Sequence, residues 1–142
     1  MREVKRSALV SQPPARVFTL INDIERYPEF LPWCTHARVL SRTPEQIVAT
    51  LGVRQGALTG EFTTRNTLVP DTGVHMHLVS GPFRTLEGEW RLSPIASHGC
   101  QVEFAVKFEF RNRLSGLLFE PLFAQTIGSL VDAFVQRARA PA

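Results

Sequence analysis

The amino-acid sequence predicts an α+β fold in which a curved antiparallel sheet wraps around one long C-terminal helix. Three observations carry this prediction. Apolar and polar residues alternate in short runs between residues 37 and 110, turn-forming residues separate these runs, and a helical apolar repeat occupies residues 114–138. Because 44% of the 142 residues are hydrophobic, the chain can form a packed core. We expect residues 1–142 to form a single domain.

The N-terminal segment predicts a strand followed by a short helix. Residues 4–11 alternate between two faces, with Val4 and Val10 on the same face, which indicates a strand. Ser11 and the two prolines that follow closely are typical of a capped helix start with proline in the first turn. The apolar stripe of this helix contains Val17, Phe18, Ile21 and Ile24.

An aromatic segment, residues 27–34, follows this helix directly. Pro28 and Pro32 lie within it, and each proline lacks an N–H group and restricts the residue before it. A continuous helix is therefore excluded, and we expect a kinked corner that folds over an apolar region. The large side chains of the corner are Tyr27, Phe30, Leu31 and Trp33.

Six further strands are expected between residues 37 and 110. Short turns are predicted at residues 54–56, 70–73 and 97–99, where glycine, proline and small polar residues gather. The clearest alternation covers residues 101–110, where the polar face is mostly charged. Its apolar face contains Val102, Phe104, Val106, Phe108 and Phe110. Alternation of this kind is typical of an antiparallel sheet with one dry face and one solvated face.

The C-terminal repeat predicts a helix whose apolar stripe is wider than a surface helix needs. We therefore expect the sheet to surround it, with Pro121 kinking the helix or marking a short leading turn. A twisted sheet and a helix differ in curvature, and the mismatch predicts an apolar pocket between them. The stripe contains Leu117, Leu118, Phe119, Leu122, Phe123, Ile127, Leu130, Val131 and Phe134.

Charge and cysteine content limit the class of protein. The net charge is +3, and 13 acidic residues are interleaved with the basic ones, which predicts a mixed solvated surface with an anionic partner as the alternative. Cys34 and Cys100 provide neither a metal-ligand spacing nor a disulfide framework. The N-terminus lacks the apolar core of a signal peptide, and no apolar run approaches the ~18 residues of a membrane span. We expect a cytoplasmic location, with peripheral contact to the inner face of the membrane as an alternative.

Residues suited to catalysis or metal binding form no complete set. His75 and His77 share a strand face, but catalytic zinc needs a third protein ligand that the sequence does not identify. Cys34 lies two residues from His36, yet a buried, inert thiol is the simpler interpretation. Motifs for phosphate, dinucleotide or nucleophilic-serine chemistry do not occur. We expect binding rather than catalysis, with no metal and no required cofactor.

Four segments resemble the coenzyme Q-binding START-domain family, a polyketide cyclase/dehydrase-like group that includes ribosome association toxins. In chain order these are Tyr27–Cys34, Phe62–Asn66, Gly81–Trp90, and Phe108–Asn112 with the helix ending Val131–Ala138. The resemblance covers nearly the whole chain, although the ending, residues 139–142, lacks the aromatic-glycine tail of many relatives. It implies a helix-grip fold of the START or birch-pollen-allergen type, in agreement with the elements predicted above.

The resemblance implies that the chain binds ubiquinone or a related isoprenoid lipid in an apolar cavity and supports respiratory electron transfer as a carrier or chaperone. One alternative is a toxin that binds the large ribosomal subunit and blocks subunit association; another is a polyketide cyclase or dehydratase. Ribosome binding would use basic residues near the two chain ends to contact phosphate. These are Arg2, Lys5, Arg6, Arg111, Arg113, Arg137 and Arg139.

The expected ligand site consists of residues that face the pocket or its mouth. Asn66 and Trp90 are candidate donors to quinone carbonyls, and the aromatic segment with Phe83 would form the entrance. The full set is Tyr27, Phe30, Leu31, Trp33, Phe62, Asn66, Met76, Phe83, Trp90, Phe104, Phe108, Phe123, Ile127 and Leu130.

Overall fold

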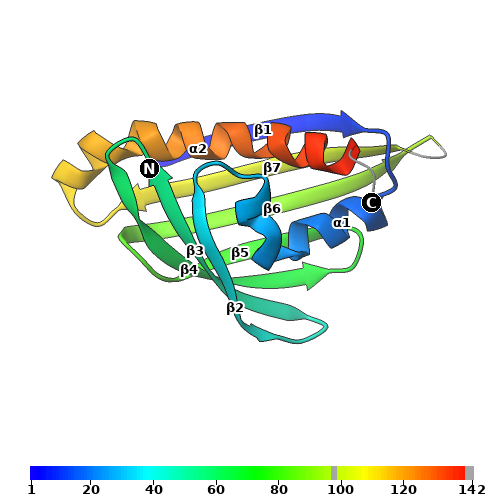
Figure 1. Ribbon diagram of the computed structural model, residues 1–142, viewed down its shortest axis with the longest axis horizontal. Coiled ribbons are helices and arrows are strands. Elements are labelled where there is room, and N and C mark those ends of the chain that lie inside the picture. The colour runs from blue at the N-terminus through cyan, green and yellow to red at the C-terminus, as the bar shows by residue number, and fades with distance from the viewer. Residues whose placement is uncertain (97–98, 140–142) are drawn as a thin grey trace.

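A curved seven-stranded antiparallel sheet wraps around a long C-terminal helix in the computed structural model, which describes residues 1–96 and 99–139 (Figure 1). The elements are β1 (Arg2–Val10), α1 (Pro14–Asn22), the 3-10 helix η1 (Ile24–Glu29), β2 (Cys34–Arg42), β3 (Gln46–Gln55), β4 (Leu58–Val69), β5 (Gly73–Ser80), β6 (Phe83–Ile95), β7 (Gly99–Phe110) and α2 (Arg113–Arg139). This order confirms the predicted α+β fold. The turn expected around Ser97 and His98 lies outside the described residues.

The strand order in the sheet is β1-β7-β6-β5-β4-β3-β2, so consecutive strands pair from β2 to β7 and β1 joins beside β7. Every pair is antiparallel, and the register aligns the apolar faces of neighbouring strands. Phe104 on β7, for example, stands opposite Trp90 on β6. The alternation of the sequence therefore becomes one continuous dry face, which turns toward α2.

The helix α2 lies along β1 and β7 and fills the hollow of the sheet (Figure 1). Its buried residues include Phe123, Ile127, Leu130 and Phe134. By length and composition α2 would also pass for a membrane span, a property that it shares with core helices of soluble proteins. The burial of its central and C-terminal turns identifies it as the core helix here.

The first two turns of α2 differ from the prediction. Leu117 and Leu118, assigned to the buried stripe, are largely exposed, so their assignment was wrong. Apolar periodicity continues along the helix, but burial in the sheet begins only near Leu122 and Phe123. The helix also runs through Pro121 without interruption.

The corner that follows α1 packs onto the C-terminal part of α2. Pro14 begins α1 as expected, whereas Ser11 does not cap it, because Pro13 precedes the helix and makes no side-chain hydrogen bond. Within the corner, Tyr27 and Phe30 meet the Phe134 ring edge to face, with centroid distances of 5.4 and 5.1 Å. The aromatic corner predicted from the sequence therefore closes this end of the core.

Candidate functional site

An apolar cavity of about 60 Å³ lies between the inner face of the sheet and α2. Its wall comes from η1, the segment after η1, strands β3 to β7, and the middle of α2. The lining residues are Ile24, Tyr27, Trp33, Ala49, Leu51, Phe62, Thr64, Asn66, Met76, Leu86, Trp90, Phe104, Val106, Phe123, Thr126, Ile127 and Leu130.

Strand register shapes the apolar part of this wall. Trp90 and Phe104 are cross-strand partners whose rings lie 4.2 Å apart between centroids, tilted by 34°. Met76 stands opposite Gly88 on the next strand, and a Cβ atom at Gly88 would collide with the Met76 methyl group. The missing side chain of Gly88 therefore makes room for a flexible thioether in the cavity wall.

Two polar side chains of the wall can donate hydrogen bonds to a bound molecule. The indole N–H of Trp33 is buried and has no hydrogen-bond partner among the described residues. The Asn66 side-chain oxygen accepts a hydrogen bond from the Thr64 hydroxyl at 2.8 Å, so its amide hydrogens are what Asn66 offers to a ligand. A buried donor without a partner costs free energy, which a ligand acceptor would recover.

Tyr27 is the one ionisable side chain among the described residues of the cavity wall. Its hydroxyl donates to the Ile21 carbonyl oxygen. Burial, reinforced by the nearby Cys34 and Asp23, raises the pKa of Tyr27 well above its usual value. The wall described here therefore holds no carboxylate or imidazole for general acid–base chemistry.

We call the seam between the β3–β4 hairpin and α2, from the Phe62–Phe123 ring contact to the contact of Gly56 with Leu122, the mouth of the cavity. Leu51 and Phe62 are cross-strand partners in the wall and keep partial solvent exposure. The Leu122 methyl groups lie close to Gly56 at the tip of the hairpin. This contact closes the gap between the hairpin and the helix.

The structure brings ten of the fourteen predicted site residues into the cavity wall. The ten are Tyr27, Trp33, Phe62, Asn66, Met76, Trp90, Phe104, Phe123, Ile127 and Leu130. The other four lie outside the lining. Phe30 packs on Phe134, and Leu31 is fully buried within the corner. Phe83 and Phe108 contact Phe123 in an aromatic cluster, so Phe83 lies in the core and not at an entrance.

Seven lining residues were absent from the predicted site. Strand alternation carried a signal for several of them, because Thr64 shares a face with Asn66, and Leu86 shares one with Trp90. Thr126 carried no such signal, since a buried threonine in a helix is unexpected until its hydroxyl is seen to bond the Leu122 carbonyl oxygen at 3.0 Å. The seven are Ile24, Ala49, Leu51, Thr64, Leu86, Val106 and Thr126.

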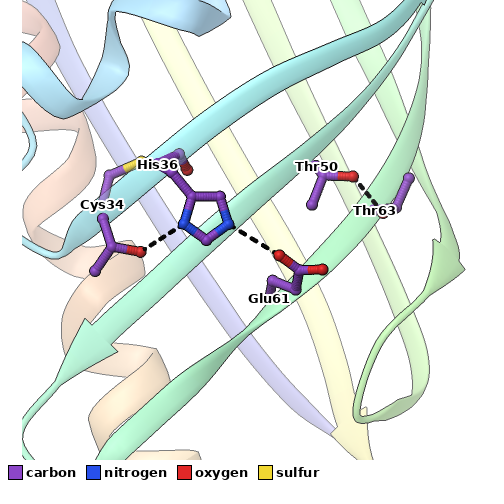
Figure 2. Close-up of polar contacts among 6 residues, drawn as sticks. Cys34, His36, Thr50, Glu61 and Thr63 are labelled. Carbon is purple, nitrogen blue, oxygen red and sulfur yellow. Dashed lines mark hydrogen bonds and ion pairs between the residues drawn. The ribbon is translucent and has the colours of Figure 1, made fainter.

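His36, which the sequence places two residues from Cys34, belongs to a separate polar cluster on the outer face of the sheet (Figure 2). The His36 ring bonds the Glu61 carboxylate at 2.9 Å and the Thr35 hydroxyl at 3.1 Å. Cys34 instead directs its thiol to the His36 backbone carbonyl oxygen at 3.4 Å. Burial raises the pKa of the Cys34 thiol to about 11. Cys34 and His36 therefore do not form a nucleophile–base pair, in agreement with the inert-thiol interpretation.

Comparison with known proteins gives a consistent result. Residues 10–135 match the family described as polyketide cyclase / dehydrase and lipid transport. The chain is 40% identical over 136 residues to the ribosome association toxin RatA of Pseudomonas aeruginosa, covering 96% of this chain and 94% of that protein. It is 27% identical over 140 residues to the coenzyme Q-binding protein COQ10 homolog B, mitochondrial, of Xenopus laevis, covering 96% of this chain and 57% of that protein.

A solved structure extends the comparison to the fold. The Zhui aromatase/cyclase from Streptomyces sp. R1128 superposes with a TM-score of 0.85, covering 96% of this chain and 93% of that chain. At 18% identity this likeness shows the fold alone. Together the comparisons confirm the resemblance and the helix-grip fold predicted from the sequence.

Proposed function

Because the chain belongs to the polyketide cyclase/dehydrase and lipid transport family, we propose that it binds ubiquinone or a related isoprenoid lipid in the cavity beside α2. In this role it carries or presents the quinone to respiratory enzymes and does not transform it. The named relatives include a coenzyme Q-binding protein, which supports a quinone ligand. The lining residues support a binding role, because their one ionisable group, Tyr27, is buried and hydrogen-bonded.

The observation that carries the proposal is the unpaired indole N–H of Trp33, a residue of this mostly apolar wall. An isoprenoid chain gains about 25 cal/mol for each Å² of apolar surface that leaves water, so it needs no charged anchor. A quinone head adds two carbonyl oxygens, which accept hydrogen bonds but donate none. Trp33 and Asn66 supply donors of the matching kind.

The proposal requires the cavity to open. Its volume of about 60 Å³ is well below the roughly 300–1,000 Å³ of pockets that hold drug-sized ligands. We expect the cavity to expand at the mouth, because only the Leu122 side chain approaches the Gly56 backbone there and α2 packs mainly on β1 and β7. Separation of the hairpin from the helix would join the cavity to the surface.

Lipid extraction from the purified protein, followed by mass spectrometry and by titration with a short-tail ubiquinone, tests the proposal. A dimethyl ether of the reduced quinone, which keeps the ring but lacks the carbonyl groups, serves as the matched ligand. We expect the native protein to prefer the quinone by about tenfold, the value of one well-made hydrogen bond. Trp33→Phe should abolish this preference. Failure to carry lipid, together with no saturable quinone binding, would overturn the proposal.

A second candidate function is ribosome binding, which the name of the Pseudomonas relative states for that protein, with the large subunit as the partner that the family resemblance implies. The observation that favours it is a set of three exposed arginines on the outer face of β2 to β4. Arg38, Arg54 and Arg65 form no ion pair with any described residue, while the nearby Glu61 is bound to His36. Arginine guanidinium groups are well suited to phosphate contact.

Several basic residues near the chain ends are less available for phosphate contact than the sequence alone implied, because they already contact other groups of the protein. Arg2 pairs with Glu120 at 3.6 Å, Lys5 lies 3.8 Å from Glu3, and Arg137 bonds Glu29 at 2.8 Å. Arg6 lies over Gly128 of α2. The outer face of β2 to β4 is therefore the stronger candidate for a phosphate-binding surface.

Cosedimentation with large ribosomal subunits at low and moderate salt tests this second candidate. Binding through arginine–phosphate contacts should weaken steeply as salt rises, because counterions are released on binding. Arg38→Gln combined with Arg65→Gln should weaken ribosome binding and make the remaining affinity less dependent on salt concentration. Arg84→Gln is the matched control, since Arg84 already faces Glu109 at 3.6 Å. Absence of cosedimentation at both salt concentrations would overturn ribosome binding.

A further inference from the structure

We propose that the first turns of α2 form a docking surface for an anionic phospholipid bilayer. Three neighbouring leucines, Leu114, Leu117 and Leu118, are 64%, 75% and 59% exposed. Their spacing places them on one side of the helix, where they form a contiguous apolar surface that we call the leucine tip. Exposed apolar clusters of this kind are uncommon on soluble domains unless they bind something.

The charges around the leucine tip identify the chemistry of its partner. Arg111 and Arg113 flank it, and residues 110–119 contain no acidic residue. Arg113 forms no ion pair with any described residue. The nearest acids in the chain are both engaged: Glu109 faces Arg84 at 3.6 Å, and Glu120 faces Arg2 at the same distance. An apolar centre with a cationic rim matches a membrane surface that carries anionic headgroups.

The position of the leucine tip favours a bilayer over a second copy of the chain. The start of α2 lies at one end of the molecule, where no other element covers it (Figure 1). Met1, which is also exposed, lies at the same end, since its amino group is 3.8 Å from Glu109. A symmetric dimer through this surface would bring the arginines of both copies together without acids to pair with them.

Docking at this surface would also place the cavity mouth next to the bilayer. Leu118 precedes Leu122 by one helical turn, and Leu122 closes the mouth against Gly56. This consequence rests on the proposed ligand-binding function, whereas the docking surface itself does not. A lipid that leaves the bilayer would meet the cavity without crossing water.

Vesicle flotation with the full chain tests the proposal. One set of vesicles contains phosphatidylcholine alone, and the other contains phosphatidylcholine with phosphatidylglycerol. The test variant is Leu117→Ser combined with Leu118→Ser. The matched control is Leu9→Ser combined with Leu40→Ser, because these leucines are 67% and 54% exposed on strands β1 and β2. Circular dichroism confirms that each variant is folded before binding is measured.

We expect the native protein to float with the anionic vesicles and the test variant to bind about tenfold more weakly, because two leucine side chains no longer enter the lipid. The control should bind as the native protein does. Arg113→Gln should weaken binding about fivefold on anionic vesicles only. Absence of vesicle binding, or equal binding by the test variant, would overturn the proposal. A dimer in solution that the leucine variant dissociates would assign the surface to self-association instead.

The outcome is separable from that of ligand binding. Trp33→Phe alters the cavity wall and leaves the leucine tip intact, so it should float like the native protein. Vesicle binding without any quinone binding would overturn the proposed function and keep the docking surface. Quinone binding without vesicle binding would overturn the docking surface and keep the proposed function.

Discussion

Buried polar atoms are few, and most of them have partners within the fold. The hydroxyls of Thr50 and Thr63 lie 2.7 Å apart across β3 and β4 (Figure 2). Only three buried side-chain atoms among the described residues lack a partner, and they belong to Asn22, Trp33 and Thr85. Trp33 is the one of these three that borders the cavity. One of the three unsatisfied atoms therefore belongs to a residue of the proposed ligand site.

The raised pKa of the Cys34 thiol predicts a loss of stability at alkaline pH. Its usual value is 9.0, and burial raises it to about 11 in the folded protein. Between these values the unfolded chain loses its thiol proton while the native protein keeps it, so rising pH favours unfolding. We expect the free energy of unfolding, measured by urea titration, to fall from pH 9 to pH 11.

Cys34→Ala is the variant that isolates this effect. Its unfolding free energy should fall less steeply over the same range. Some dependence should remain, because burial also raises the pKa values of Tyr27 and Cys100. Parallel pH profiles for the native protein and the variant would contradict the assignment to Cys34.

At the scale of elements, the outer face of β2 and β3 contains a tight contact that depends on a glycine. The register of β2 against β3 shifts between Cys34 and Ala37, and the His36 ring lies across Gly52. A Cβ atom at Gly52 would collide with both His36 and the Thr35 hydroxyl. The absence of a side chain at Gly52 is therefore what allows His36 to reach Glu61.

Gly52→Ala should destabilise the protein by about 1–3 kcal/mol, because the His36 ring must move and its bond to Glu61 is lost. Thermal unfolding measures the change. Gly60→Ala is the matched control on the neighbouring strand, since a Cβ atom there meets no atom within 4 Å. The free energy of unfolding of this control should rise by about 0.5–1 kcal/mol, because alanine restricts the unfolded chain more than glycine does. Equal effects of the two changes would contradict the role of the His36 contact.

The helix α2 offers a second comparison, between a residue in the packed core and one on the cavity wall. Phe134 contacts Tyr27, Phe30 and Trp90, so Phe134→Ala should cost about 3–5 kcal/mol. Ile127 borders empty space, so Ile127→Ala should cost about 2 kcal/mol and change quinone affinity more. Denaturant unfolding and quinone titration measure the two effects. Equal stability losses with unchanged quinone binding would count against a ligand site along α2.

The elements were predictable from sequence because each has a local signal, but their limits were not. Alternation identified the strands, and the three- and four-residue repeat identified α2. The same repeat includes Leu118 and Ile127, yet one is exposed and the other buried, because the reach of the sheet depends on distant strands. Phe83 and Trp90 both lie on the dry face of β6, but only Trp90 is near enough to border the cavity. The unpaired state of Trp33 needed the folded neighbours and could not be predicted.

At the scale of the whole molecule, the two halves of the sheet carry different outer surfaces. The outer face around β1, β6 and β7 contains several ion pairs, in agreement with the mixed surface that the interleaved charges predict. The face of β2 to β4 instead carries Arg38, Arg54 and Arg65, which form no ion pair within the part of the chain that the structure describes. An anionic macromolecule would therefore meet β2 to β4, whereas a membrane would meet the leucine tip. The two proposed contacts do not overlap.

Ligand binding should stabilise the whole domain, because the ligand binds only the folded protein. At a free quinone concentration 100-fold above Kd the gain is about 2.7 kcal/mol. For a chain of this size that gain raises Tm by roughly 8 °C. Differential scanning fluorimetry with a short-tail ubiquinone measures the shift, and the dimethyl ether analogue should produce a smaller one. An unchanged Tm with saturating quinone would contradict binding in the core.

The open sheet ends in β2, whose outer edge pairs with no strand among the described residues. An edge of this kind is a template on which other chains can add strands and grow into aggregates. In β2 the ladder is broken twice, between Cys34 and Ala37 and between Val39 and Ser41. These bulges twist the edge and interrupt its regular row of amide groups. The irregularity that sets His36 in place thus also disfavours the addition of a foreign strand at this edge.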